Sequence, residues 1–426
     1  MRTTLRTRTA LGIAVLASVS LVATGCATDD GSGTGDGGEI TLTIATFNDF
    51  GYTDALLQEY MDANPGVTIV HNRAATSNDA RANFFQKLGA GSGLADVEAI
   101  EVDWLPEMMQ YADKLYDLSD PSVDDRWLDW KTAAATDADG RLVGYGTDIG
   151  PEAICYRADL FAEAGLPSER GEVAALLEGG WDRYFEVGHD YVAATGNAWY
   201  DSAGATYQGM INQFANYYEK NDGTVIATSN PDVEATFRTV LEESADLSAK
   251  LGQWSDDWFG ALSTGGYATM LCPGWMLGVI SGNAADTTGW DIADVFPGGG
   301  GNWGGSYLTV PAQGKNTEEA KKFAAWLTAP EQQVKAFANA GTFPSQVDAY
   351  SDEALTASVN EYFNNAPVGE ILINRANAVD PVPPFKGAKY FQINDAAQQA
   401  LTRVEEGQQS IDESWAQFVS EVEALG

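Results

Sequence analysis

An alternation of strand-like and helix-like segments, beginning near residue 40, limits the possible folds of this chain more than any other feature. Residues 40–47 alternate apolar side chains with threonine, as expected for a β-strand. Apolar residues at helical spacing follow, and an Asn-Pro-Gly turn separates them from a second strand-like run at residues 67–70. The same order repeats with a helical pattern around Phe84 and a strand pattern at residues 97–102. Strands that alternate with helices in this way predict an α/β architecture.

Length and later segments extend this prediction. About 385 residues follow residue 38, which is too many for one ordinary hydrophobic core and suits two lobes. Residues 306–310 resemble a further strand, and Asn316 followed by Glu319 predicts a capping box for a helix that Pro330 ends. No run after residue 26 approaches the 18 or so apolar residues of a membrane-spanning helix.

The N-terminal segment differs from the rest of the chain. Arginines in the first eight residues precede a mostly apolar stretch at residues 10–23, and Thr-Gly then leads to Cys26. These are the parts of a secretory signal peptide, and the apolar stretch is too short to span about 30 Å of hydrocarbon. We therefore predict a signal peptide over residues 1–25 and a flexible tether over residues 26–38, which are rich in Gly, Ser, Thr and Asp.

Cys26 and the residues before it resemble the bacterial lipoprotein box, in which the cysteine becomes the lipidated N-terminus. The box usually has leucine three places before the cysteine, where this chain has Ala23. The resemblance implies that a lipid on Cys26 holds the mature chain on the extracellular face of the cell membrane. An ordinary secretory signal with an incidental cysteine is the alternative.

The charge of the chain narrows its partners. It has 24 basic and 61 acidic residues and a formal net charge of −37. Such a field repels nucleic acid and does not attract anionic lipid headgroups. We therefore expect no nucleic-acid partner, a monomer, and attachment to the membrane through the lipid alone.

Two cysteines remain once Cys26 is assigned to the anchor. Cys155 and Cys272 each lie in an apolar, strand-like run. In an oxidising compartment such a pair tends to form a bond. We predict a disulfide bond between neighbouring strands; two buried free thiols are the alternative.

The sequence offers little for catalysis or for metal binding. His71 and His189 lie in unrelated segments without neighbouring ligands, and the chain lacks a Gly-x-Ser-x-Gly elbow and a Gly-Lys-Ser/Thr phosphate loop. Gly299, Gly301 and Gly304 have the spacing of a dinucleotide motif, but that motif opens a helix and this segment continues into a strand-like run. We therefore predict no catalytic residue, no metal and no cofactor.

Tryptophan is abundant, with twelve residues, several of them in polar or glycine-rich connections. The C–H faces of a pyranose ring lie flat on an indole, whereas its hydroxyl groups require partners such as Asp, Glu and Asn. Asp103 and Trp104 place both types at a strand end, Asp148 follows another strand, and Trp303 lies in a glycine-rich loop. Because ligands of open α/β sheets bind beyond the carboxyl ends of strands, these residues predict a sugar-binding site.

Three segments carry a resemblance to a known family. Residues 144–161, which begin Gly-Tyr-Gly-Thr-Asp-Ile-Gly-Pro-Glu, resemble the crossover of the family 1 extracellular solute-binding proteins, the sugar receptors of ABC importers. Residues 265–275, ending in Pro-Gly-Trp, resemble the family's second-lobe strand and its stacking tryptophan, and residues 315–337 resemble its returning helix pair. The resemblance covers residues 40–426. It implies two lobes, joined by crossing strands, that close on a ligand by hinge motion.

The resemblance also implies a division of the chain and a set of ligand contacts. The first lobe would comprise residues 39–147 and 307–343, and the second residues 148–306 and 344–426. The implied contacts lie at strand ends, crossings and stacking positions: Asn48, Asp49, Asp103, Trp104, Asp148, Trp275, Trp303 and Phe343. A further aromatic contact is expected near Lys386, Tyr390 and Phe391, where spacing does not choose among the residues, and Glu152 is an alternative rim residue.

The resemblance implies a receptor that captures an oligosaccharide and delivers it to a membrane permease. The chain most resembles the cello-oligosaccharide receptors of high-GC Gram-positive bacteria, which implies cellobiose or cellotriose, although maltose-type and xylose-type sugars fit the same residues. Two interpretations from other classes stay open. One is a surface glycoside hydrolase that uses Glu101 or Asp103 with Asp148; the other is a receptor of the same fold for a polyamine or ferric ion.

Overall fold

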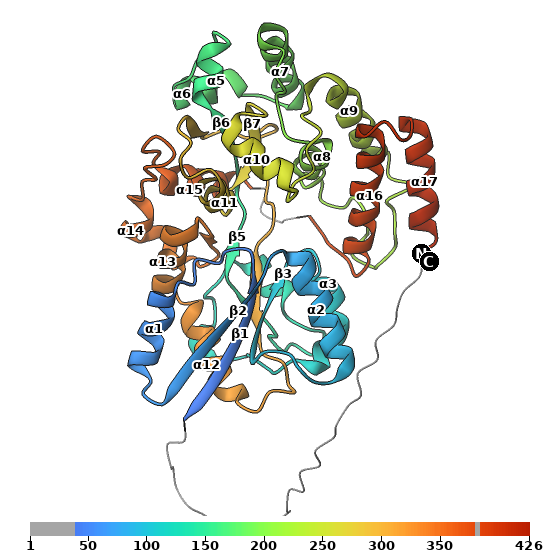
Figure 1. Cartoon of the computed structure of the whole chain (residues 1–426). Coiled ribbons are helices and arrows are strands. Elements are labelled where there is room, and N and C mark those ends of the chain that lie inside the picture. Colours follow the sequence, from blue (N-terminus) through green and yellow to red (C-terminus); the bar gives the residue numbers. More distant parts are fainter. Residues whose placement is uncertain (1–38, 380–383) are drawn as a thin grey trace, which may run out of the picture. The chain divides into compact units, whose positions relative to one another are not determined.

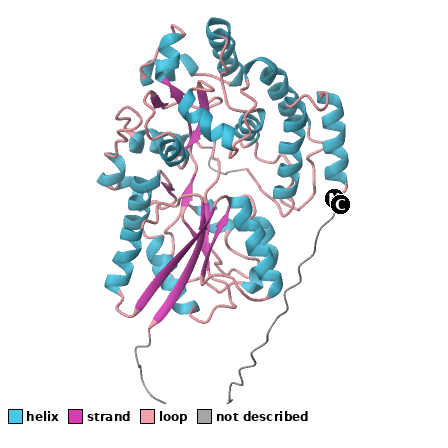
Figure 2. Ribbon diagram, in the orientation of Figure 1, coloured by secondary structure: helices cyan, strands magenta, loops and turns pink. Residues whose placement is uncertain are grey.

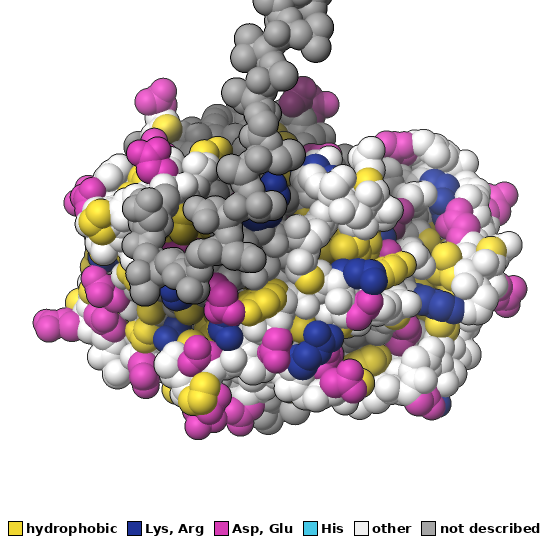
Figure 3. All heavy atoms as spheres, turned by 90° about the horizontal axis from the view of Figure 1, so that it is seen from below, with side chains coloured by type: hydrophobic (Ala, Val, Ile, Leu, Met, Phe, Trp, Pro, Cys, Tyr) yellow, Lys and Arg dark blue, Asp and Glu magenta, His cyan; other side chains and the backbone are white. Residues whose placement is uncertain are grey.

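The computed structural model describes residues 39–379 and 384–426 (Figure 1). The predicted signal peptide, the lipidation site at Cys26 and the tether lie outside the described residues. Within the described ranges, no helix is long and apolar enough to span a membrane. On the face shown in Figure 3, Asp and Glu side chains are spread over the surface with Lys and Arg among them.

The first sheet has five strands in the order β2-β1-β3-β9-β4. These strands are β1 (Ile40–Phe47), β2 (Val67–Ala74), β3 (Val97–Glu101), β4 (Tyr145–Gly146) and β9 (Ser306–Thr309). β1 is parallel to β2 and β3, whereas β9 is antiparallel to β3 and β4. Leu42 and Ile44 of β1 are fully buried, as its alternating pattern predicted.

Helices α1 (Asp54–Ala63), α2 (Ser77–Ala90), α3 (Leu105–Met108) and α12 (Thr317–Leu327) belong to this half of the fold, and the 3-10 helix η1 (Met109–Lys114) follows α3. The predicted capping box of α12 is wrong. Asn316 has φ −116° and ψ 41°, outside the extended conformation of a usual cap, and its side chain makes no capping hydrogen bond. α12 does end just before Pro330, with its C-cap at Thr328, and Pro330 is the first residue of α13 (Pro330–Ala340), where a missing N–H costs nothing.

The second sheet has three antiparallel strands in the order β7-β6-β8. They are β6 (Glu152–Arg157), β7 (Thr269–Pro273) and β8 (Trp290–Ala293), and every residue of β6 is buried. Helices make up most of the structure around both sheets (Figure 2).

Two buried apolar clusters accompany this second sheet. One includes side chains of the following helices: α5 (Ala158–Glu163), α6 (Arg170–Leu177), α7 (Trp181–Thr195), α8 (Ala203–Ile211), α9 (Pro231–Leu247), α16 (Tyr390–Glu405) and α17 (Ile411–Glu423). The other includes side chains of α10 (Asp256–Thr264), α11 (Met276–Asn283), α13, α14 (Glu353–Thr356) and α15 (Val368–Ala378). The first sheet has a separate cluster.

The chain passes between the sheets through short extended segments. After β4 it runs through β5 (Asp148–Ile149) into β6, and it returns between β8 and β9. β10 (Phe343–Pro344) pairs antiparallel with β5, which adds a third strand at the crossing. Two sheets, each with its own apolar core and joined by crossing strands, confirm the predicted two-lobed α/β fold.

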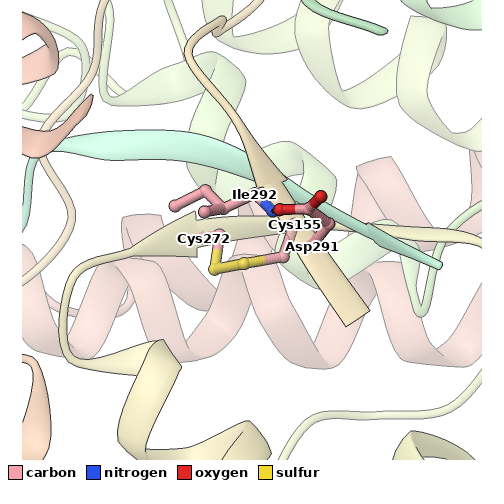
Figure 4. The surroundings of a disulfide bond; sticks show 4 residues. All are labelled: Cys155, Cys272, Asp291 and Ile292. Carbon is pink, nitrogen blue, oxygen red and sulfur yellow. Dashed lines mark hydrogen bonds between the residues drawn. A yellow bond between two sulfur atoms is a disulfide. The ribbon is translucent and has the colours of Figure 1, made fainter. Parts of the chain in front are cut away.

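The structure contains the predicted disulfide bond between Cys155 of β6 and Cys272 of β7, next to Asp291 and Ile292 of β8 (Figure 4). The strands are neighbours, and Ala153 lies opposite Cys272, so that the two cysteines are diagonal partners with Cα atoms 5.4 Å apart. This separation lies in the usual range for a bridge. Both cysteines are fully buried, and the alternative of two free thiols is not what the structure shows.

Candidate functional site

A cavity of about 350 Å³ lies where strand ends of the first sheet, the crossing segments and loops of the second lobe meet. Its volume falls within the range of small-molecule sites, roughly 300–1,000 Å³. Its lining combines aromatic rings, carboxylates, and small or amide side chains: Phe47, Asn48, Asp49, Phe50, Thr76, Ser77, Asn78, Glu101, Asp103, Asp148, Gln253, Trp254, Trp275, Val279, Trp303, Gly304, Gly305, Ser306, Thr342 and Phe391.

Six of the eight predicted contact residues line this cavity: Asn48, Asp49, Asp103, Asp148, Trp275 and Trp303. They come together from β1, β3, the crossing at β5 and the loops after β7 and β8. The strand-end positions and the family resemblance therefore selected residues that are far apart in the sequence but meet at one cavity. Their role in binding stays a prediction.

The other two predicted residues do not line the cavity. Trp104 is fully buried, and its Nε1–H donates to Ser77 Oγ at 3.0 Å. Phe343 is fully buried in β10, with its ring centroid 5.8 Å from that of Phe337. Both lie at the predicted strand end or crossing, but a strand-end position does not fix the direction of the side chain.

Three tryptophans, Trp254, Trp275 and Trp303, lie together on one side of the cavity, which we call its aromatic side. The rings of Phe47, Phe50 and Phe391 line other parts of the cavity. The rings of Trp254 and Trp275 are nearly parallel, with centroids 6.0 Å apart and an interplanar angle of 21°. Trp303 lies edge-on to Trp275 at 6.2 Å. Trp275 Nε1–H donates to the Trp303 carbonyl at 3.0 Å, which fixes the orientation of the central indole.

The sequence did not single out Trp254. It precedes the N-cap of α10 and has a φ of 72°, a left-handed conformation that a bulky residue seldom adopts. Such a conformation costs on the order of 1–3 kcal/mol and often accompanies a functional constraint. An indole immediately before a Ser-Asp-Asp helix start was the available signal.

Asp148 lies at the crossing, where two hydrogen bonds fix the orientation of its carboxylate. Its Oδ1 accepts from Thr147 Oγ1 at 2.7 Å and from the Ser306 N–H at 2.9 Å. Burial raises the pKa of Asp148, and Lys131 opposes that shift. The side chain is thus held in one orientation at the cavity wall.

Lys131 is the cation behind this wall. It is buried, its Nζ lies 4.0 Å from the Tyr307 ring centroid, and within the described residues that nitrogen has no hydrogen-bond partner. Burial lowers the pKa of Lys131 to about 8, against the opposing charges of Asp148 and Glu101. An ammonium group over an aromatic face is partly stabilised by the ring.

Glu101 and Asp103 form a second polar group at the end of β3. The Asp103 N–H donates to Glu101 Oε2 at 2.8 Å, and Lys386 forms an ion pair with Asp103. Burial raises the pKa of Glu101 well above its usual range, and the nearby Asp103 charge adds to this. Burial would lower the pKa of Lys386, but Asp103, Tyr217 and Glu101 raise it above its ordinary value.

Asn48 and Asp49 complete the polar side. Asn48 has a left-handed φ of 46°, and its Oδ1 is buried without a hydrogen-bond partner in the part of the chain that is described. A buried acceptor of this kind costs about 1–3 kcal/mol, so a ligand donor would relieve it. Asp49 is half-exposed; its Oδ1 accepts from the Gly51 N–H at 2.9 Å and lies 3.6 Å from Arg73 Nη2.

Glycines permit close approach of the backbones at the crossing. A Cβ on Gly150 would lie 1.7 Å from the Trp303 carbonyl oxygen, and one on Gly305 would lie 2.7 Å from the Asp148 carbonyl oxygen. Gly305 also has a left-handed φ of 112°. The glycine-rich segment leads into β9 and not into a helix, in agreement with the rejection of a dinucleotide motif.

Several lining residues were not among the eight predicted contacts, and Phe391 is one of the three residues among which the spacing did not choose. Residues 76–78 lie at the N-terminal end of α2, and Phe391 lies in the first turn of α16. No group of three or more His, Cys, Asp or Glu residues that could hold a metal ion occurs among the described residues. His71 and His189 instead have single partners, Thr46 Oγ1 and Glu243 Oε2, each at 2.7 Å.

Known proteins resemble this chain over most of its length. The model of the family described as bacterial extracellular solute-binding protein matches residues 55–363. The arabinooligosaccharide-binding protein of Bacillus subtilis (strain 168) is 24% identical over 388 residues, which cover 85% of this chain and 87% of that protein.

Solved structures agree with this assignment. A crystal structure of an extracellular solute-binding protein of family 1 is 52% identical, with a TM-score of 0.80, and the match covers 90% of this chain and 99% of that one. An ABC transporter-associated binding protein from B. animalis subsp. lactis Bl-04, in complex with β-1,6-galactobiose, is 20% identical with a TM-score of 0.76, over 89% of this chain and 96% of that one. At 20% identity the second likeness supports the fold alone.

Proposed function

Because this chain belongs to the family 1 bacterial extracellular solute-binding proteins, we propose that it is the receptor of an ABC importer and binds an oligosaccharide in the cavity described above. It would capture the sugar by closure of its lobes and deliver it to the membrane permease. Two relatives are named arabinooligosaccharide-binding proteins, which supports a sugar ligand.

The observation that carries this proposal is the division of the cavity into an aromatic and a polar side. Trp254, Trp275 and Trp303 offer indole faces or edges to the apolar C–H groups of sugar rings. Asp103 and Asp148 offer carboxylates that accept from hydroxyl groups and are already oriented by other contacts. A cavity with both features suits a neutral, hydroxyl-rich ring.

Several oligosaccharides are candidates for the ligand. The resemblance to cello-oligosaccharide receptors favours cellobiose and cello-oligosaccharides, whereas the relatives named above bind arabinooligosaccharides and β-1,6-galactobiose. Maltose-type and xylose-type oligosaccharides fit the same kinds of side chain. Linkage specificity depends on hydroxyl geometry, which a panel of disaccharides would resolve.

We further propose binding without turnover. Most glycoside hydrolases need one carboxyl group that acts as the acid and a second that acts as nucleophile or base. Here Asp103 is paired with Lys386, and Asp148 accepts from Thr147 and Ser306. A purified protein that binds a sugar stoichiometrically and releases no reducing sugar would support the receptor; steady release would support the hydrolase.

The N-terminal segment completes the proposal. We propose that residues 1–25 are removed, that Cys26 carries lipid, and that residues 26–38 tether a monomeric body to the extracellular face of the membrane. We also propose the division into residues 39–147 with 307–343 and residues 148–306 with 344–426, in which α13 of the first set packs against both lobes. Mass spectrometry of the mature N-terminal peptide tests the anchor: an unmodified Cys26, or an N-terminus elsewhere, would overturn it.

The binding proposal is tested by titration of purified protein with arabinobiose, cellobiose, β-1,6-galactobiose, maltose and xylobiose, followed by Trp emission and calorimetry. We expect at least one sugar to bind with one-to-one stoichiometry and to shift the emission, because indoles line the cavity. Absence of binding for every sugar would overturn the proposed function.

A further inference from the structure

An ion pair joins two distant parts of the chain beside the cavity. Asp103 follows β3 of the first sheet, and Lys386 lies just before α16, 283 positions later. The two side chains are only 17% and 9% exposed. Because water screens such a pair weakly, its two charges interact more strongly than a surface pair.

Lys386 is positioned by the second lobe. Its Nζ lies 4.6 Å from the ring centroid of Tyr390, the first residue of α16. The adjacent Phe385 N–H donates to the Ala215 carbonyl at 2.9 Å, and Tyr217 OH lies 3.1 Å from Tyr390 OH. Tyr217 and Tyr390 belong to the apolar cluster of α7–α9, α16 and α17, and α16 and α17 lie side by side in Figure 1.

A second contact holds the start of α16 against the first lobe. The Arg81 guanidinium of α2 lies 4.0 Å from the Phe391 ring centroid and donates to Glu107 Oε2 from its Nε at 2.9 Å. The N-terminal end of α16 therefore contacts the first lobe at two points. Lys386 can hold Asp103 only while that end of the helix stays in place.

The charges around Lys386 explain why the pair matters to the cavity. Asp103 and Glu101 lie together at the end of β3, and both line the cavity. The charge of Lys386 stabilises the ionised forms of Glu101 and of Glu152, whose side chain is fully buried. Without that cation, the poorly exposed Asp103 carboxylate would lose its charged partner and its fixed orientation.

We propose that Lys386 is a positioning residue of the binding site, which orients Asp103 for a sugar hydroxyl and couples the C-terminal helices to ligand binding. This inference rests on the proposed function. Lys386 lies beyond residue 363, where the match to the family model ends. The site is thus completed by a segment outside the matched part of the chain.

The test compares Lys386→Met with Lys386→Arg and with Lys389→Met. Methionine keeps an unbranched side chain without charge, and arginine restores the cation. Lys389 is the matched control, since it lies three residues further on and its ammonium group contacts the Gly426 carbonyl at the surface. Each purified protein is titrated with the tightest-binding sugar of the panel named above, and its thermal midpoint is measured.

We expect Lys386→Met to weaken sugar binding roughly tenfold or more, a difference of about 1.4 kcal/mol. Lys386→Arg should recover most of the affinity, and Lys389→Met should bind as the unaltered protein does. Equal affinity of Lys386→Met and the unaltered protein would overturn the inference, and so would a weakened Lys386→Arg that matches the methionine variant. Failure of the unaltered protein to bind any sugar of the panel would overturn the proposed function and, with it, this inference.

Hydrogen exchange of the unaltered protein provides a second test that does not depend on a variant folding. Amides of residues 385–391 should exchange more slowly when the sugar is bound, because the start of α16 is then held through Asp103. Exchange in this segment that is unchanged by saturating sugar would overturn the inference.

Discussion

The polar side of the cavity comes largely from strand ends of the first sheet and from the crossing, whereas its aromatic side comes from loops that flank the second sheet. Polar side chains on the first side have charged partners behind them: Lys131 behind Asp148, and Lys386 beside Asp103. The aromatic side is held by backbone: a left-handed Trp254 and a hydrogen bond from Trp275 to the Trp303 carbonyl.

Because of this contrast, we expect substitutions on the two sides of the cavity to have different effects on stability and on affinity. A buried charge that loses its partner is costly to the fold, so the polar side couples binding to stability. An indole at a cavity wall can be truncated at less cost to the fold, so the aromatic side should affect mainly affinity. The disulfide bond also supports the backbone of the aromatic side, because Trp275 lies two residues beyond the end of β7, the strand that carries Cys272.

The largest effect is expected for Asp148→Ala. This change removes the larger of the two negative charges that oppose the desolvation of buried Lys131, and it removes the acceptor for Thr147 and Ser306. We expect a loss of about 3–5 kcal/mol in the free energy of unfolding, measured in urea, and loss of sugar binding. The control Asp49→Ala removes a half-exposed carboxylate and should cost under about 1 kcal/mol. Equal costs for the two variants would contradict the assigned role of Lys131.

Removal of the disulfide comes next. The double variant Cys155→Ala and Cys272→Ala opens a covalent link across 117 positions of sequence. We expect a loss of about 2–5 kcal/mol in the free energy of unfolding. Sugar affinity at 25 °C should change little, because β6 and β7 still pair along their length. A large loss of affinity with unchanged stability would show that the bridge acts on the site and not on the fold.

Trp275 is expected to act mainly on affinity. Trp275→Ala should weaken sugar binding roughly tenfold or more, or about 1.4 kcal/mol, in calorimetric titration. Trp275→Phe keeps an aromatic face but loses the hydrogen bond to the Trp303 carbonyl. Its sugar affinity should therefore lie between that of the alanine variant and that of the unaltered protein. Unchanged affinity in the alanine variant would remove Trp275 from the site.

The last expected effect is a pH dependence of stability from Glu152. Burial raises its pKa to about 8, and Lys386 opposes the shift. Between roughly pH 4.5 and 8 the folded form holds a proton that the unfolded form releases, so this group's contribution to stability falls as pH rises, by at most about 1.4 kcal/mol per pH unit.

Glu152→Gln should remove that part of the pH dependence and should raise stability most at pH 8 relative to the unaltered protein. Urea unfolding at pH 5, 6.5 and 8 measures the difference. Parallel stability profiles for the two proteins would contradict a protonated Glu152.

Periodicity predicted the fold well because strands and helices impose different spacings on apolar residues. β1 begins and ends at the predicted residues, and the paired cysteines lie in adjacent strands as expected. The N-terminal end of α12 was predicted less well, because Asn316 is a residue type that suits a helix cap but lacks the backbone conformation of one.

The sequence predicted those site residues whose position at the end of a strand is enough to place them at the cavity. Strand ends identified Asp103 and Asp148, but the same argument also selected Trp104, whose indole turns into the core toward Ser77. Trp254 and Lys386 reach the site through tertiary packing, from a turn before α10 and from a segment before α16. The sequence places these residues near a helix start, but the contacts that they make depend on the tertiary fold.

The central claim is that one sugar ring lies between the tryptophans and the carboxylates of this cavity. A crystal structure with the tightest-binding sugar of the panel tests it most directly. We predict a sugar ring against the Trp275 indole with hydroxyl groups within hydrogen-bonding distance of Asp103 and Asp148. A bound sugar that contacts neither Trp275 nor these carboxylates would contradict the account.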